Sequence, residues 1–106
     1  MWHYGRYNFV ERLQRRDDPV AAALCLGEFL NATMRLCIYL DGDFAPYWKW
    51  MPFRFRKIGW ATDFIRHVDA LAISADKEEQ AEHVDAICEL ADAKLVQEDI
   101  DMEVDA

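Results

Sequence analysis

The chain has 106 residues, 53% of them apolar, and carries a formal net charge of −8 at neutral pH. This length supports one hydrophobic core, and the apolar content is high enough to fold it. Only four glycines and three prolines are present, which argues against a turn-rich β-sandwich and favours helices. We therefore expect a single helical domain over residues 1–106.

The charge is distributed unevenly along the chain. Residues 1–67 hold ten Lys or Arg against seven acids, whereas residues 68–106 hold two Lys against thirteen acids. An anionic ligand is therefore expected to contact the first two-thirds of the chain. The strongly negative total disfavours a general nucleic-acid groove, because attraction to phosphates dominates such binding.

The spacing of apolar residues predicts a first helix over residues 4–15. Asp18 is the expected N-cap of a second helix, with Pro19 in its first turn. This helix is expected to end at Leu40, where the acidic turn at residues 41–43 stops it.

The second helix is apolar nearly all round, which is typical of a central helix. The charges of Glu28 and Arg35 within it argue against a membrane span, so we expect a soluble, cytoplasmic protein. Cys25, Cys37 and Cys88 lack the spacing of a metal or redox motif and are expected to be buried, reduced thiols.

Three further helical segments are predicted. Pro46 is expected to open a third helix, which Pro52 must interrupt or restart. Gly59 is expected to end this segment, and Thr62 to cap a fourth helix that runs to about Ile73.

The sequence from Asp76 to Glu79 matches a capping box at the start of the last helix. The apolar stripe expected along that helix consists of Val84, Ile87, Cys88, Ala91 and Leu95. Together these patterns predict an all-α fold, a four- to five-helix up-and-down bundle.

Residues 45–60, APYWKWMPFRFRKIGW, combine six aromatic side chains with four cations. Aromatic side chains can stack on a base while Lys and Arg neutralise phosphates, but aromatics at helical spacing more often belong to a core. We expect a mixed arrangement, in which the apolar edges hold the bundle together while Lys49 and Arg54 face a shared cleft.

Glu28, Asn31 and Arg35 share one face of the second helix by their spacing. Burying such groups unpaired is costly. They are therefore expected either to satisfy one another inside the bundle or to line a cleft or an interface.

No catalytic or metal-binding motif is recognisable in the sequence. The paired acids have no accompanying strand or Gly-Ser turn, and His3, His67 and His83 lack partners at ligand spacing. We expect no catalytic residue, no bound metal and no cofactor, and therefore no enzymatic activity of the chain on its own.

An ordered succession of motifs runs through residues 5–58: a Tyr-Asn before an Arg, a basic-Asp turn, a Glu-Phe pair in a helix, and a Pro-Tyr-aromatic-Lys-Trp run followed by Arg. The residues are Tyr7, Asn8, Arg12, Arg16, Asp17, Glu28, Phe29, Pro46, Tyr47, Lys49, Trp50 and Arg54. This succession resembles the helical region of the bacterial family called domain of unknown function 4037. The resemblance implies a HEPN-like bundle, similar to the substrate-binding subunit of a nucleotidyltransferase, that follows a nucleotidyltransferase-like domain.

The resemblance further implies a C-terminal accessory domain that helps form a nucleotide or acceptor site, in a homodimer. The residues expected to face the nucleotide or the anionic acceptor are Arg12, Arg16, Glu28, Arg35, Tyr47, Lys49, Trp50 and Arg54. A structural dimerisation or protein-interaction module is the alternative. An RNA-binding or RNA-cleaving HEPN-like domain is less favoured, because no Arg precedes a His by four to six residues.

Overall fold

A computed structural model describes the backbone of residues 18–105 and the side chains through residue 98. This part of the chain forms α2 (Pro19–Leu40), α3 (Met51–Phe55), a short 3₁₀ helix η1 (Gly59–Ala61), α4 (Thr62–Ile73) and α5 (Lys77–Asp105). It contains no strand. The helix expected over residues 4–15, with Arg12 and Arg16, lies outside the described residues.

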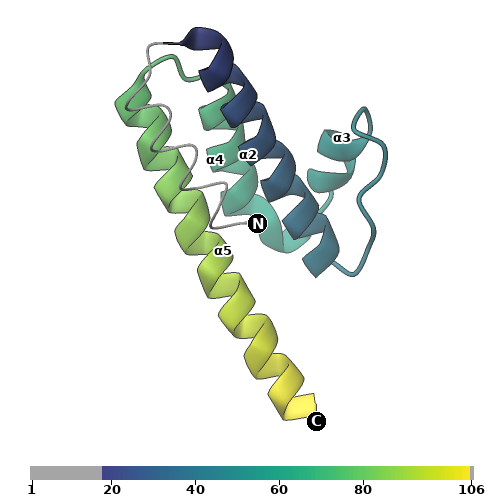
Figure 1. The fold of residues 1–106 in the computed structure, drawn as a ribbon. Helices are drawn as coiled ribbons and strands as arrows, with labels where there is room; N and C mark the ends of the chain where they lie inside the picture. Colours follow the sequence, from purple (N-terminus) through teal and green to yellow (C-terminus); the bar gives the residue numbers. More distant parts are fainter. Residues whose placement is uncertain (1–17, 106) are drawn as a thin grey trace.

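The three long helices run alternately down, up and down, while α3 lies against the end of α2 (Figure 1). The closest packing between elements joins α4 to α5. This arrangement confirms the predicted all-α, up-and-down bundle.

The core is formed by side chains at helical spacing on the inward faces. In α4 these are Phe64, Val68 and Leu71, so their spacing follows the helical repeat. In α5 the predicted stripe is buried from position 84 to position 91, and Leu95 is half-buried. The buried apolar side chains are Cys25, Phe29, Cys37, Ile38, Met51, Phe55, Ile58, Ala61, Phe64, Val68, Leu71, Val84, Ile87, Cys88 and Ala91.

Both ends of α2 follow the prediction. The Asp18 carboxylate accepts hydrogen bonds from the Val20 amide at 3.0 Å and the Ala21 amide at 3.3 Å, which satisfies two amides of the first turn. After Leu40 the chain turns at Gly42, whose φ of 85° is readily adopted only by a residue without a Cβ. The capping role of the acid before α5 is also confirmed, since Asp76 Oδ1 accepts from the Glu78 amide at 3.0 Å.

Two local predictions are wrong. Pro46 does not open a helix; α3 begins only at Met51, with Pro52 in its first turn, where a missing N–H is tolerated. The restart alternative was therefore correct. Thr62 is not the N-cap of α4, because Ala61 takes that position and the Thr62 hydroxyl instead donates to the Gly59 carbonyl at 3.3 Å.

The three cysteines are free and buried, as expected. Burial raises the pKa of the Cys37 thiol to about 12, against an opposing effect of the nearby Lys94 charge. A thiol held in its neutral form is a poor nucleophile and a poor metal ligand. Cys37 therefore serves the core as a small apolar side chain.

Candidate functional site

Segment 41–60 links α2 to α4 and is held to the bundle by three buried apolar side chains. A turn, in which the Trp50 amide donates to the Tyr47 carbonyl at 2.8 Å, leads the chain into α3. Met51 and Phe55, four residues apart on α3, are each 1% exposed, and Ile58 follows them into the core. These contacts fix which way the rest of the segment faces.

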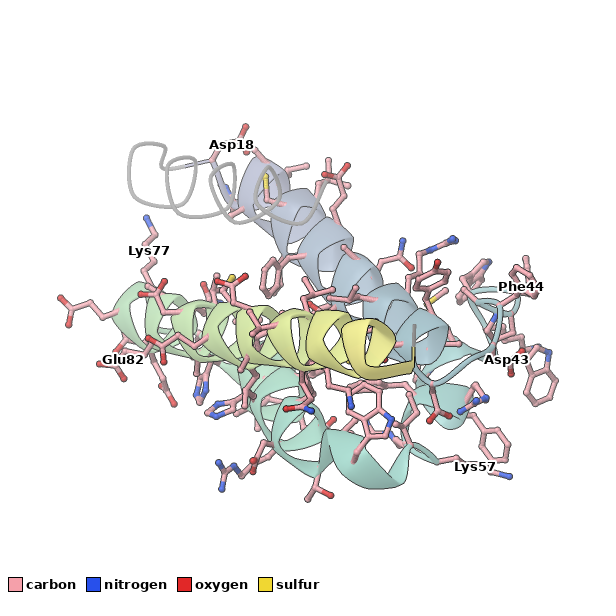
Figure 2. All side chains as sticks on the ribbon, turned by 90° about the horizontal axis from the view of Figure 1, so that it is seen from below. Asp18, Asp43, Phe44, Lys57, Lys77 and Glu82 are labelled. Atoms are coloured by element: carbon pink, nitrogen blue, oxygen red, sulfur yellow. The ribbon has the colours of Figure 1, made fainter. Side chains whose placement is uncertain are left out.

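The other large side chains of the segment face solvent. Their exposed fractions are 88% for Phe44, 65% for Tyr47, 67% for Trp48, 59% for Trp50 and 59% for Phe53. Figure 2 shows Phe44 at the outer edge of the molecule, beside Asp43 and pointing away from the helices. We call these five residues the aromatic surface. Large exposed apolar groups on one short segment make this segment the candidate interaction site of the described residues.

A polar network ties this segment to the C-terminal end of α2. The Arg54 guanidinium donates to Asp41 Oδ2 at 2.8 Å and to Asp43 Oδ2 at 3.1 Å. The Trp60 indole donates to the other Asp41 oxygen at 3.0 Å. Asp41 therefore joins the end of α2 to α3 and to η1.

The same network sets the charge state of its members. The hydrogen bond from Arg54 holds the pKa of Asp41 below its usual value. The pKa of Asp43 is lowered first by the hydrogen bond from the Phe44 amide and then by Arg54. Both carboxylates are ionised at neutral pH, so they neutralise Arg54 with charges from its own chain.

Trp60 connects this network to α5. The Lys94 ammonium lies 4.2 Å from the centre of the Trp60 ring, a cation–π contact, and 3.2 Å from a Glu98 carboxylate oxygen. The Trp60 ring also meets Phe64 edge-on, at 6.1 Å between ring centres. The C-terminal end of segment 41–60 is therefore held by contacts with the end of α2, with α4 and with α5.

Two of the four cations in the segment are neutralised internally. Besides Arg54, the Arg56 guanidinium pairs with Asp69, with one N–O distance of 2.8 Å. Lys57 lies 4.4 Å above the Phe53 ring. Lys49 is exposed and has no ionic partner among residues 18–98. The positive charge available to a partner on this face therefore comes from the two lysines.

Of the residues expected to face a ligand, the described ones lie on α2 and on segment 41–60, and Arg12 and Arg16 lie outside the described residues. Tyr47, Lys49 and Trp50 lie together on the exposed segment. Arg54 lies at the base of that segment, in contact with Asp41 and Asp43 rather than with Lys49. These contacts do not test whether Lys49 and Arg54 face one cleft, and that arrangement stays a prediction.

The polar stripe on α2 is not buried. Glu28 and Arg35 are exposed, and the Arg35 Nε donates to Asn31 Oδ1 at 3.4 Å. The alternative in which the stripe is satisfied inside the bundle is therefore wrong. The core is filled by apolar side chains, and the face of α2 that carries Glu28 and Arg35 points to water.

A pair of histidines was missed by the sequence reasoning, which treated them as isolated. The Nδ1 atoms of His67 on α4 and His83 on α5 lie 3.0 Å apart. Each histidine directly precedes a buried valine, a signal that could have placed each of them beside the α4–α5 seam, although not opposite one another. The pKa of His67 is lowered mainly by burial, then by the charges of Arg66 and His83.

The two imidazoles share a hydrogen bond in which one Nδ1 carries the proton and the other accepts it. Glu79 lies 4.0 Å from the outer nitrogen of His83. Among the described residues no group of three or more metal-ligating side chains occurs.

The fold and this surface define a small all-α domain whose distinguishing feature is an exposed aromatic segment. Residues 1–51 match the family described as Domain of unknown function (DUF4037), which confirms the resemblance to that family over this part of the chain. The matched range includes the predicted ligand-facing residues up to Trp50 but not Arg54. No curated protein and no solved structure matches the chain.

Helix α2 is, by length and composition, long and apolar enough to cross a membrane. The core helix of a soluble protein and a signal sequence meet the same criterion. One face of α2 is buried in this bundle, through Cys25, Phe29, Thr33, Cys37 and Ile38. The finding therefore assigns no location to the protein.

Proposed function

We propose that this chain is a non-catalytic helical accessory domain that binds another protein surface through its aromatic surface. The observation that carries the proposal is the exposure of the five aromatic side chains on a segment that is itself firmly held. Aromatic side chains supply much of the binding free energy at protein interfaces, and a fixed backbone lowers the entropy lost on binding. The chemistry of the described residues supports binding rather than catalysis.

A photo-crosslinking experiment tests this proposal in the full chain. Trp48 is replaced by p-benzoylphenylalanine, which keeps an aromatic side chain at the centre of the surface. Tyr39, which is equally exposed but lies on α2, receives the same replacement as the matched control. We expect a discrete crosslinked product from position 48 in cells and none from position 39.

The identity of the product decides between partners. A second copy of the chain or a protein with a nucleotidyltransferase-like domain agrees with the proposal. Equal products from both positions, or none from position 48, would show that the aromatic surface is not an interface.

A second candidate function names the partner as the nucleotidyltransferase-like domain implied by the family resemblance. On this hypothesis the helical domain described here helps the nucleotidyltransferase-like domain to bind a nucleotide or acceptor. The position of Lys49 favours it, because this cation is exposed between Trp48 and Trp50 and no described acid pairs with it. On this hypothesis Lys49 contacts a phosphate while Tyr47 and Trp50 orient it.

The second candidate is tested on the purified pair of proteins by titration with ATP and Mg²⁺. The loss of one charged contact to phosphate weakens binding by roughly 1–2 kcal/mol, or about five- to thirtyfold, so we expect this loss for Lys49→Ala. Lys57→Ala removes the same charge beside Phe53 and is the control. Equal affinities for the two variants would remove Lys49 from any nucleotide site.

A further inference from the structure

The C-terminal end of α5 projects beyond the other helices and is acidic, whereas the aromatic surface is flanked by cations. Helix α5 has 29 residues and is about 44 Å long at 1.5 Å per residue, against 22 residues for α2 and 12 for α4. Figure 1 shows its C-terminal part extending past the ends of the other helices. Ala91 is buried, Leu95 is half-buried and Val96 is 58% exposed, so the core ends near this point.

The sequence of the projecting part is both acidic and amphipathic. Positions 96, 100 and 104 are Val, Ile and Val, and a repeat of four places them on one face of a helix. Residues 97–106 contain five acids and neither Lys nor Arg. An acidic helix with one apolar face is suited to a surface that offers aromatic rings beside cations.

The aromatic surface offers this combination. Its five rings are flanked by Lys49 and Lys57, while Asp41 and Asp43 share the single guanidinium of Arg54, so two lysines and one arginine against two acids leave a surplus of one positive charge. The charge facing a partner is therefore positive, although the chain as a whole is negative. An acidic partner is attracted to this face, and a basic one is repelled.

Resting on the function proposed above, we infer that the partner is a second copy of this chain, whose projecting α5 end lies across the aromatic surface. Within one copy this contact is not available, because α5 continues as one helix to Asp105 and does not turn back toward segment 41–60. Two copies related by a twofold axis each supply one helix end and one aromatic surface. Such a reciprocal contact closes on itself and gives a dimer.

The available area is sufficient for a stable dimer. A fully buried aromatic side chain covers about 150–250 Å², so five that are more than half exposed offer roughly 500 Å². Two such contacts, each with a matching area on the helix end, bury roughly 2,000 Å² in total. Stable interfaces begin at about 1,200 Å².

The first experiment measures the mass of the full chain in solution by sedimentation equilibrium or light scattering, over a wide concentration range and at low and high salt. We expect a dimer that weakens as salt is raised, because charge pairs across the interface are screened. The variant Trp48→Ser, Trp50→Ser is expected to be monomeric. Tyr39→Ser, which removes an equally exposed ring from α2, is expected to remain dimeric.

A complementation experiment identifies which surfaces meet. The variant Ile100→Ser, Val104→Ser alters the helix end and is expected to be monomeric, like the variant of the aromatic surface. Mixing the two variants leaves one intact contact per pair, so a heterodimer is expected, weaker than the wild-type dimer. Circular dichroism of each variant confirms that its helices are retained.

Each outcome bears on the inference. A wild-type chain that is monomeric at all concentrations, a dimer that survives Trp48→Ser with Trp50→Ser, or a mixture that fails to complement would overturn it. A monomeric chain whose position 48 still crosslinks to another protein would leave the proposed function standing and remove only the second copy as the partner. No crosslink at position 48 would remove both.

Discussion

In the hairpin of α4 and α5 most of the large apolar side chains face inward, whereas in the segment from Asp41 to Trp60 most aromatic side chains face water. Both regions are rich in apolar residues, and both are held by specific contacts. They differ in the backbone. A long helix places residues three and four apart on one face, while a segment interrupted by Pro46 and Pro52 has no long repeat to bring its rings together.

The comparison shows that an apolar composition does not by itself determine which side chains are buried. The two prolines limit segment 45–60 to one short α-helix, α3, which buries two side chains, Met51 and Phe55. The remaining rings are exposed because the bundle is already filled by α2, α4 and α5. Exposure of this kind has a cost in solubility, which the partner surface proposed above would offset.

The largest expected effect compares two phenylalanines that are two residues apart. Phe55→Ala removes a ring that is 1% exposed and leaves a cavity, so we expect a loss of about 3–5 kcal/mol in the free energy of unfolding. Phe53→Ala removes a ring that is 59% exposed and contacts Lys57, and we expect less than about 1 kcal/mol. Urea denaturation of both variants measures the difference. Similar losses would mean that Phe53 is buried in solution.

The helices of the bundle could be predicted because each carries several independent signals that agree. For α2 these are the acid at Asp18, Pro19 in the first turn, a long apolar run and the glycine in the turn after Leu40. The repeat in α5 likewise predicted its buried stripe. Local rules of capping and spacing act within one or two turns and can be read from the sequence.

The candidate site could be predicted only in part. Tyr47, Lys49 and Trp50 were singled out by composition, but the partners of Arg54 could not be, because Asp41 and Asp43 are 13 and 11 residues away and meet it only through the fold. The pairing of His67 with His83 likewise depends on how α4 packs on α5. Contacts between elements require the relative positions of helices, which the spacing of residues within one helix does not contain.

A smaller effect is expected at the N-terminal end of α2. Asp18→Ala removes the acceptor of two backbone amides, and we expect a loss of about 1 kcal/mol, measured by urea denaturation. Asp18→Asn keeps an acceptor and is expected to retain most of the stability. Equal losses in both variants would assign the effect to the charge rather than to the hydrogen bonds.

The histidine pair predicts how stability depends on pH. Because the folded-state pKa of His67 lies below its unfolded value, the unfolded chain binds more protons as the pH falls from about 7 toward that lowered pKa. Stability is therefore expected to decrease over this range and to level off below it.

The urea midpoints at about pH 8 and about pH 5.5 test this prediction. His67→Asn keeps a side chain that can hydrogen-bond but does not titrate, so its midpoint is expected to fall less between the two pH values. The charges near the pair are Arg66 and Asp63 on α4 and Glu79 on α5. His3→Asn is the control. An unchanged pH dependence in His67→Asn would assign the effect to other groups.

The smallest effect on global stability, but a distinct local one, is expected from breaking the network at the base of the aromatic surface. Arg54→Gln removes the ion pairs with Asp41 and Asp43, which are partly accessible to solvent, so the unfolding midpoint is expected to change little. The segment itself loses its tie to the end of α2 and opens more often.

Chymotrypsin, which cleaves after exposed aromatic residues, is then expected to cut the variant several-fold faster than the wild type, because cleavage follows the population of locally open states. Arg35→Gln, which loses only a bond to Asn31 within α2, is expected to be cut at the wild-type rate. In the wild type the same opening is expected only as the pH falls through the lowered pKa values of Asp41 and Asp43, where the carboxylates protonate and release Arg54; pepsin, which is active in acid, then replaces chymotrypsin as the protease. If Arg54→Gln is cut no faster than Arg35→Gln, the buried side chains Met51, Phe55 and Ile58 alone determine how the aromatic surface is held.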